Sequence, residues 1–482
     1  RTVMLFNSLE FLIFLPIVFL LYWHVFKPLR WQNFFVVVAS YVFYGWWDWR
    51  FLLLILFTSL CSFASGILLQ RFDKSKKWRK VISGTNIAIN IAILGVVKYY
   101  DFFASQLVEA FSGLGVQLNL TSLNIILPVG ISFYTFQALS YTVDIYRRKL
   151  EPTRDVIAFL AFISFFPQLV AGPIERATNL LPQFLKPRKF DYALAVDGMR
   201  QILWGLFKKM VVADTCATAC NEIFADYATK SGGELIVGAL FFTFQIYGDF
   251  SGYSDIAIGT AKLFGVRLMR NFNVPYFSRD IAEFWRRWHI SLNTWFVDYV
   301  YIPLGGSRNG KWKTVRNTLI IFGLSGLWHG ANWTYIVWGF YHAFLFIPLF
   351  LFGLNHKRKD VVAAQSWHPS WKEALQMLTT FCFVVIGWII FRAENIGQAW
   401  GYISRMFCEF DGTFPKHGNT PLIYCGIVLL VEWMQRKKEH AFQIPHRSLF
   451  AYRPVRWIFY FAVFVCTYFF MGNQSTFIYF QF

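Results

Sequence analysis

A histidine inside a long apolar segment is the residue of this sequence best suited to chemistry. His329 lies in SGLWHGANW, within the apolar stretch 317–353. A neutral imidazole takes the proton from a hydroxyl group as that oxygen attacks an acyl carbon, and its ordinary pKa of about 6.5 keeps it mostly neutral at pH 7. The nearest polar neighbours are Ser325, Asn332 and Thr334, without a carboxylate among them. This pattern predicts direct transfer between two bound substrates, without an acyl-enzyme.

The segment around His329 is too long for one membrane helix. As an uninterrupted helix it would extend about 55 Å at 1.5 Å per residue. It also joins two basic segments, 308–316 and 356–359, which we expect on the same side of a membrane. A helical hairpin resolves both problems, and the turn should lie where glycines cluster: Gly323, Gly326 and Gly330. His329 would then lie near the tip, at membrane depth, where an ionisable residue indicates function. The alternative is a neutral histidine that ties two helices together through a backbone carbonyl.

A second stretch, WRRWHISLNTWFVDYVYIPLGG (285–306), mixes charged and aromatic residues with apolar ones. Arg286, Arg287 and His289 cannot face lipid at low cost, because a charge at the bilayer centre costs at least about 2.5–3.5 kcal/mol. The pattern fits a helix that lies in the interface or lines a cavity. The alternative is an interfacial anchor with snorkelling arginines, which periodicity alone favours. As part of a site, Arg286 and Arg287 would attract an anionic substrate.

Two further stretches combine polar residues with breaks in an apolar frame. FQIYGDFSGYSDIAIG (244–259) carries Asp249 and Asp255, for which we favour ion pairing with Arg286 or Arg287 over a direct contact with substrate. FFPQLVAGPIER (165–176) contains two prolines and a glycine, and it is assigned to architecture.

The composition excludes a soluble globular protein. Of 482 residues, 56% are hydrophobic, 21% aromatic and only 15% charged, whereas about a quarter of the residues of a soluble domain are charged. Such a chain suits a lipid environment with aromatic belts at its two interfaces. The net charge of +19 does not indicate nucleic acid, because the basic residues fall between apolar runs, where the positive-inside rule places them.

Other common chemistries lack motif support. Most of the seven cysteines are expected to be small buried hydrophobes, and Cys216 and Cys220 lack the remaining ligands of a zinc site. The sequence contains no P-loop, GxGxxG, HExxH or paired CxxC motif. We therefore expect no bound metal and no tightly bound cofactor.

Apolar runs spread over the whole chain predict an all-α, polytopic integral membrane protein. We expect about 11 transmembrane helices plus re-entrant and interfacial helices, since a span needs roughly 20 apolar residues. The first five spans alternate correctly if the N-terminus lies outside and the basic segments 71–80 and 147–154 lie in the cytoplasm. Residues 1–482 form a single membrane-embedded domain in this interpretation, and residues 1–3, which precede Met4, are a non-native start remnant.

These stretches resemble the membrane-bound O-acyltransferase family over nearly the whole chain. The resemblance is to a bacterial branch with alginate O-acetyltransferase and teichoic acid D-alanyl transfer membrane proteins. Its markers, in order, are MLFNSLEFLIFLP, FFPQLVAGPIER, FQIYGDFSGYSDIAIG, WRRWHISLNTWFVDYVYIPLGG and SGLWHGANWTYIVWG. The resemblance implies a ring of membrane helices around a thin centre, with His329 as the essential histidine and His289 as the second family histidine. Val297 and Gln168 stand where the alginate branch usually has arginine and histidine, which leaves the particular polymer and donor open.

The sequence thus predicts a multi-pass O-acyltransferase of the bacterial cytoplasmic (inner) membrane. His329 would be the general base and His289 would position the donor or polarise the developing oxyanion, with Arg286, Arg287, Asn332 and Asp298 binding substrate. The co-substrate would be a cytoplasmic thioester, either acetyl-CoA or an acylated carrier protein. The resemblance implies an extracytoplasmic SGNH-type acyltransferase or acceptor protein as partner, besides membrane lipid. Transfer to lipid hydroxyls, transport without catalysis and a structural scaffold are the alternatives.

Overall fold

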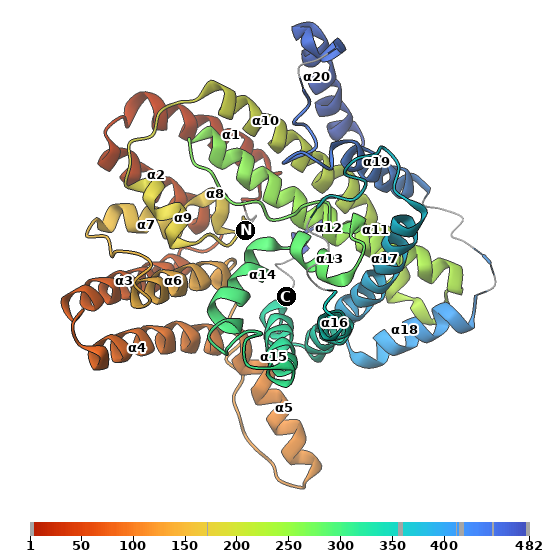
Figure 1. The fold of residues 1–482 in the computed structure, drawn as a ribbon, viewed down its shortest axis with the longest axis horizontal. Coiled ribbons are helices and arrows are strands. Elements are labelled where there is room, and N and C mark those ends of the chain that lie inside the picture. Colours follow the sequence, from red (N-terminus) through yellow and green to blue (C-terminus); the bar gives the residue numbers. More distant parts are fainter. Residues whose placement is uncertain are drawn as a thin grey trace. The chain divides into compact units, whose positions relative to one another are not determined.

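The computed structural model describes residues 4–170, 172–354, 360–410, 412–413, 419–445 and 448–478. The proposed start remnant (1–3) and the basic segment 356–359 lie outside these residues. Throughout the described ranges the secondary structure is helical, without a strand, which confirms the predicted all-α class (Figure 1). The chain divides into two compact units, one of Arg1–Ala195 with Ala261–Leu268, the other of Val196–Thr260 with Met269–Phe482.

The first unit is built from helices of the N-terminal part of the chain. In it, α6 packs against α3, α4 and α9, and α7 packs against α2, α3 and α9. Gly130 precedes α6 with φ +74°, and a side chain there would collide with the carbonyl oxygen of Leu169. The helices, with π-helical turns labelled η1 and η2, are α1 (Leu9–Leu20), η1 (Leu21–Val25), α2 (Leu29–Gly45), α3 (Arg50–Arg71), α4 (Lys76–Leu94), η2 (Gly95–Tyr99), α5 (Tyr100–Gly113), α6 (Ile131–Tyr146), α7 (Val156–Ser164), α8 (Phe166–Leu169) and α9 (Ala177–Phe184).

The second unit contains both histidine motifs. Its helices include α13, α14 and the pair α15 and α16, which lie close together in Figure 1. The elements, most of whose residues belong to this unit, are α10 (Tyr192–Leu206), η3 (Phe207–Ala213), α11 (Asp214–Ala225), η4 (Tyr227–Thr229), α12 (Gly232–Leu263), η5 (Pro275–Phe277), α13 (Ile281–Arg287), α14 (Ile290–Phe296), η6 (Val297–Tyr301), α15 (Lys311–His329), α16 (Trp333–Leu351), α17 (Trp371–Arg392), α18 (Ile396–Cys408), α19 (Asn419–Gln435), η7 (Ser448–Ala451) and α20 (Arg453–Phe469).

The predicted hairpin around His329 is confirmed. Helix α15 ends at His329 and α16 begins at Trp333, so the chain turns at Gly330. A side chain at Gly330 would collide with the ring of Tyr335, which explains the glycine at the turn. The two helices then run together at small residues, because a side chain at Gly339 would collide with the carbonyl oxygen of Phe322. The turn therefore fixes His329 at the end of a helix inside the protein.

Within the described ranges, five helical segments are long and apolar enough to cross a membrane: Arg50–Arg71, Lys76–Gly113, Gly232–Leu263, Trp333–Leu351 and Trp371–Arg392. The shorter segments Leu9–Val25 and Thr420–Gln435 are also apolar. The larger number of about 11 spans is not confirmed and stays a prediction. The apolar residues 156–169 form two short helices, α7 and α8, because the chain breaks at Phe165 before Pro167.

Candidate active site

His329 lies at the C-terminal end of α15 and is only 4% exposed. Its imidazole is enclosed by aromatic rings that stand nearly perpendicular to it. The ring centroids of Trp328, Trp338 and Phe391 lie 5.0, 5.1 and 5.3 Å from that of His329. The side chain is thus held by packing against rings from α15, α16 and α17.

His289 is held in a different way, by its backbone and by hydrogen bonds. It lies between α13 and α14 with φ +44°, a left-handed conformation that non-glycine residues rarely adopt. The side chain is 1% exposed, and its Nδ1 lies 3.1 Å from Oδ1 of Asn271. Burial lowers the pKa of the His289 imidazole to about 3, so the ring is neutral at pH 7.

The contacts of Asn271 define the tautomer of His289. Its amide nitrogen donates to Oγ of Ser254 at 3.1 Å, while its Oδ1 accepts hydrogen bonds from the backbone N–H and the hydroxyl of Ser291. Since Oδ1 is an acceptor, the nitrogen that approaches it, Nδ1 of His289, must carry the proton. The other ring nitrogen, Nε2, then carries the lone pair.

A tryptophan connects the two histidines. The ring of Trp328 lies 5.0 Å from that of His329 and 5.8 Å from that of His289. Phe250 of α12 covers His289 from another direction, with ring centroids 4.7 Å apart. The sequence motifs around residues 289 and 329 therefore converge on one aromatic-walled region of the second unit.

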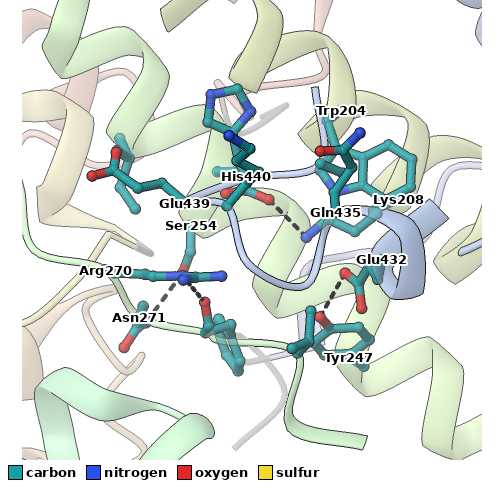
Figure 2. Close-up of a pocket in the computed structure, with 16 residues that line it drawn as sticks. Trp204, Lys208, Tyr247, Ser254, Arg270, Asn271, Glu432, Gln435, Glu439 and His440 are labelled. Carbon is teal, nitrogen blue, oxygen red and sulfur yellow. Dashed lines mark hydrogen bonds and ion pairs between the residues drawn. The ribbon is translucent and has the colours of Figure 1, made fainter. Parts of the chain in front are cut away.

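A polar cavity borders Asn271, the residue that holds His289. Its wall includes Asn271 and Ser254, whose side chains are hydrogen-bonded to each other (Figure 2), and Asn271 also contacts the imidazole of His289. The other residues lining the cavity are mostly polar or charged: Trp204, Lys208, Tyr247, Asp255, Ile258, Arg270, Phe272, Val274, Glu432, Gln435, Lys438, Glu439, His440 and Ala441.

Some of the charged side chains in this cavity are paired with other side chains of its wall. Lys208 forms an ion pair of 2.7 Å with Asp255, and the Tyr247 hydroxyl donates to Glu432 at 2.7 Å (Figure 2). Burial lowers the pKa of the Arg270 guanidinium below its ordinary value. Acidic and basic side chains are balanced, which suits a polar but largely uncharged chain better than a dense anion.

The predicted ion pairing of Asp249 and Asp255 with arginines is wrong. Asp249 pairs with Lys209 at 2.7 Å, and Asp255 pairs with Lys208. Glycines allow this: Cβ atoms added at Gly248 and Gly252 would lie 2.9 and 2.8 Å from the carbonyl oxygens of Lys208 and Gly205. Helix α12 therefore approaches α10 and η3 closely enough for the carboxylates to reach the two lysines.

The predicted substrate-binding residues lie in four different settings. Arg286 is exposed, whereas the buried Arg287 binds the carboxylate of Glu283 at 2.9 Å and the carbonyl oxygen of Asp360. Asn332 caps α16 by accepting from the N–H of Thr334, and its amide nitrogen donates to the carbonyl oxygen of Glu394. Asp298 is half-buried in the wide helical turn η6. Of the four, Arg286 is the one whose side chain is exposed, and the roles of all of them stay predictions.

Sequence reasoning missed a buried charge cluster behind His289. Lys209 binds both Asp214 and Asp249, at 2.8 and 2.7 Å, and its ammonium also donates to the carbonyl oxygen of Ser475. This cluster fixes the segment 472–478, whose Phe477 packs 6.1 Å from the ring of Phe250. Two adjacent lysines in an apolar run, at 208 and 209, were the available signal. Across the described ranges, the structure shows no cluster of histidine, cysteine or carboxylate side chains suited to a metal ion.

Comparison with known proteins shows the family to which the chain belongs. The sequence profile of the membrane-bound O-acyltransferase family matches residues 41–353, which include both histidines. The chain belongs to this family. It is 40% identical to the probable alginate O-acetylase of Pseudomonas aeruginosa over 84% of this chain and 75% of that protein. It is 29% identical to the peptidoglycan O-acetyltransferase of Helicobacter pylori over 100% of this chain and 98% of that protein. It is 31% identical to the teichoic acid D-alanyltransferase of Bacillus subtilis over 56% of this chain and 70% of that protein. The protein is therefore an integral membrane O-acyltransferase, as the sequence motifs predict.

Proposed function

We propose that this O-acyltransferase moves an acetyl group from a cytoplasmic thioester to a hydroxyl on the outer side, for O-acylation of an exported polysaccharide or another cell-envelope polymer. The observation that carries the proposal is the convergence of two buried histidines on Trp328, with Asn271 linking His289 to a polar cavity. The relatives named above act on alginate, peptidoglycan and teichoic acid, which are polymers of this kind.

In the proposed reaction, an acceptor hydroxyl oxygen attacks the carbonyl carbon of the thioester. His329 takes the hydroxyl proton as the new carbon–oxygen bond forms. The carbon–sulfur bond then breaks, and the proton passes from His329 to the leaving thiolate, which departs as a thiol. The reaction needs no acyl-enzyme, and the aromatic rings that surround His329 carry no nucleophile that could form one.

The proposed role of His289 follows from its tautomer. Because Nδ1 donates to Asn271, Nε2 carries a lone pair and accepts rather than donates a hydrogen bond. A neutral ring without a proton on Nε2 does not suit stabilisation of an oxyanion, whereas Asn271, which holds the ring, lies in the wall of the polar cavity. We therefore assign His289 to donor positioning, one of the two roles expected from the sequence.

The polar cavity is the proposed path for the donor arm. Its residues 435–441 belong to the basic stretch 435–456, which the positive-inside rule places in the cytoplasm. The arm that carries an acyl thioester, on coenzyme A or on a carrier protein, is a polar chain with amide groups, which the hydroxyl, carboxylate and amide side chains of the wall can bind. Residence in the bacterial cytoplasmic membrane and transfer through an SGNH-type partner or acceptor protein on the outer side are parts of the same proposal.

Mass spectrometry of the exported polymer tests the proposal. Cells would carry the wild-type chain, His329→Ala or His24→Ala at matched membrane protein levels. His24 is a suitable control because it is an exposed histidine of η1, outside the region of the two buried histidines. We expect the polymer to lose its O-acyl groups in His329→Ala and to keep them in His24→Ala. Unchanged O-acylation in His329→Ala, or acyl label that appears in the lipid fraction instead, would contradict the proposal.

A further inference from the structure

Aromatic side chains form a close-packed cage around His329. The cage consists of Trp328, Trp338 and Phe391, all of which pack edge to face against the imidazole. Trp338 and Phe391 are each 1% exposed, and their ring centroids lie 5.1 Å apart. The acyl carbon must come within about 3–3.5 Å of the attacking oxygen, whose proton goes to His329. The acyl tail must then lie against these rings.

Neighbouring side chains pack against the outer faces of the cage rings, so the rings cannot move outward. Trp388 stacks on Trp338 at 5.8 Å and meets the edge of Phe391 at 5.6 Å. Tyr335 supports Phe391 from another side at 4.8 Å. Aromatic side chains have few rotamers, and a close-packed interior resists added volume.

The distance between α15 and α16, the two helices that carry Trp328 and Trp338, is also fixed. Helices α15 and α16 touch at Gly326, where a side chain would collide with the carbonyl oxygen of Tyr335. At this contact the two helices cannot come any closer. They also cannot separate without breaking the packing of Trp338, which projects from α16 beside His329. The cage therefore has a set size.

We propose that Trp338 and Phe391 limit the transferred acyl group to a short chain. The inference rests on the proposed function, since it takes His329 as the base at which acyl transfer occurs. An apolar pocket that fits its substrate discriminates by about 10–200-fold for each methylene. Rigid aromatic walls give this discrimination against longer chains, because an added methylene must displace a ring.

Competition between acyl groups inside cells tests the inference. Cells with the wild-type chain, Trp338→Ala, Phe391→Val or Phe344→Ala would grow with butyrate, and mass spectrometry would give the ratio of butyryl to acetyl esters on the polymer. Phe344 is the matched control, because it is an aromatic residue of the same helix that is 65% exposed. We expect at least about a 10-fold higher ratio in Trp338→Ala and Phe391→Val, and no change in Phe344→Ala.

The outcomes separate the inference from the proposed function. A ratio that stays at the wild-type value in both cage variants, while acetylation continues, would overturn the inference and leave the proposed function standing. A polymer without O-acyl esters in wild-type cells would overturn the proposed function, and the inference with it. Because Trp338→Ala removes much buried surface, Trp338→Phe serves as a milder variant. It should raise the ratio of propionyl to acetyl esters, and an unchanged ratio in a stably folded Trp338→Phe protein would count against the inference.

Discussion

His289 and His329 lie close to the same tryptophan, but their surroundings differ in kind. His289 stands before the first turn of α14 and is held by Asn271 in one tautomer. His329 is the last residue of α15 and is enclosed by aromatic rings. One ring is therefore oriented by directional hydrogen bonds, and the other is confined by shape.

The two helix ends also favour opposite charge states. The C-terminus of a helix carries partial negative charge and stabilises a cation by about 0.3–1 kcal/mol, and up to about 2 kcal/mol where partly buried. His329 at the end of α15 is thus suited to become an imidazolium during the reaction. His289 at the start of α14 meets the positive end and is suited to stay neutral, which agrees with its lowered pKa. The difference supports the proposal that His329 transfers the proton and His289 positions the donor.

The largest predicted effect compares the same substitution at both histidines. Glutamine retains a polar side chain but cannot take up a proton. We expect His329→Gln to lower the rate of acyl transfer by about 10²–10⁴-fold, the range for a general base. His289→Gln should cost less, because it removes a positioning contact. Initial rates in membrane vesicles with equal amounts of enzyme measure both, and the reverse order of effects would exchange the two roles.

The next effect concerns the charge cluster that supports the side of His289. Lys209→Ala leaves Asp214 and Asp249 buried without their cation, and breaking a buried pair in this way costs about 3–5 kcal/mol. We expect a clear drop in Tm of the detergent-solubilised protein. The exposed Lys437→Ala is the control and should leave Tm unchanged.

A Lys209→Ala protein with wild-type Tm would mean that the segment 472–478 is held without the lysine. The double variant Lys209→Met/Asp249→Asn sharpens the result, since it removes one charge of each sign. It should recover part of the lost stability, because only Asp214 then remains to be neutralised by protonation.

The sequence predicted those features that depend on local pattern. Clustered glycines and flanking basic segments predicted the hairpin, and α15 indeed ends at His329. The ion-pair partners of charged residues on different helices could not be predicted from the sequence. The pairing of Asp249 with Lys209 depends on the rotation of α12 and on glycines that shorten one helix–helix distance. Asn271 was missed because it lies in an irregular segment without periodicity, where a sequence does not reveal which side chain approaches another.

A smaller effect is expected when the hydrogen-bond partner of His289 changes. Asn271→Asp places a carboxylate beside Nδ1, and an adjacent negative charge raises the pKa of a histidine. In the wild-type protein, whose His289 has a pKa of about 3, this ring stays neutral from pH 8 to pH 5 and causes no loss of activity there. In Asn271→Asp the ring becomes protonated as the pH falls, and the lone pair of Nε2 is lost. Rate profiles from pH 8 to pH 5 should show an additional acidic fall in the variant, and superimposable profiles would remove His289 from donor positioning.

The smallest predicted effect is at Arg286, which lies on the turn of helix before His289. The side chain is exposed, so any attraction for an anionic donor acts through water and is weakened by salt. We expect Arg286→Ala to raise the KM for the donor several-fold at low salt, with kcat unchanged, and the difference to fade as salt increases. Arg287→Ala should behave differently, because Arg287 binds Glu283 and the backbone of Asp360 and its loss lowers stability rather than donor affinity. A salt-independent fall in kcat for Arg286→Ala would instead place this arginine at the reacting centre, so that a cation as well as Asn271 would act beside His289.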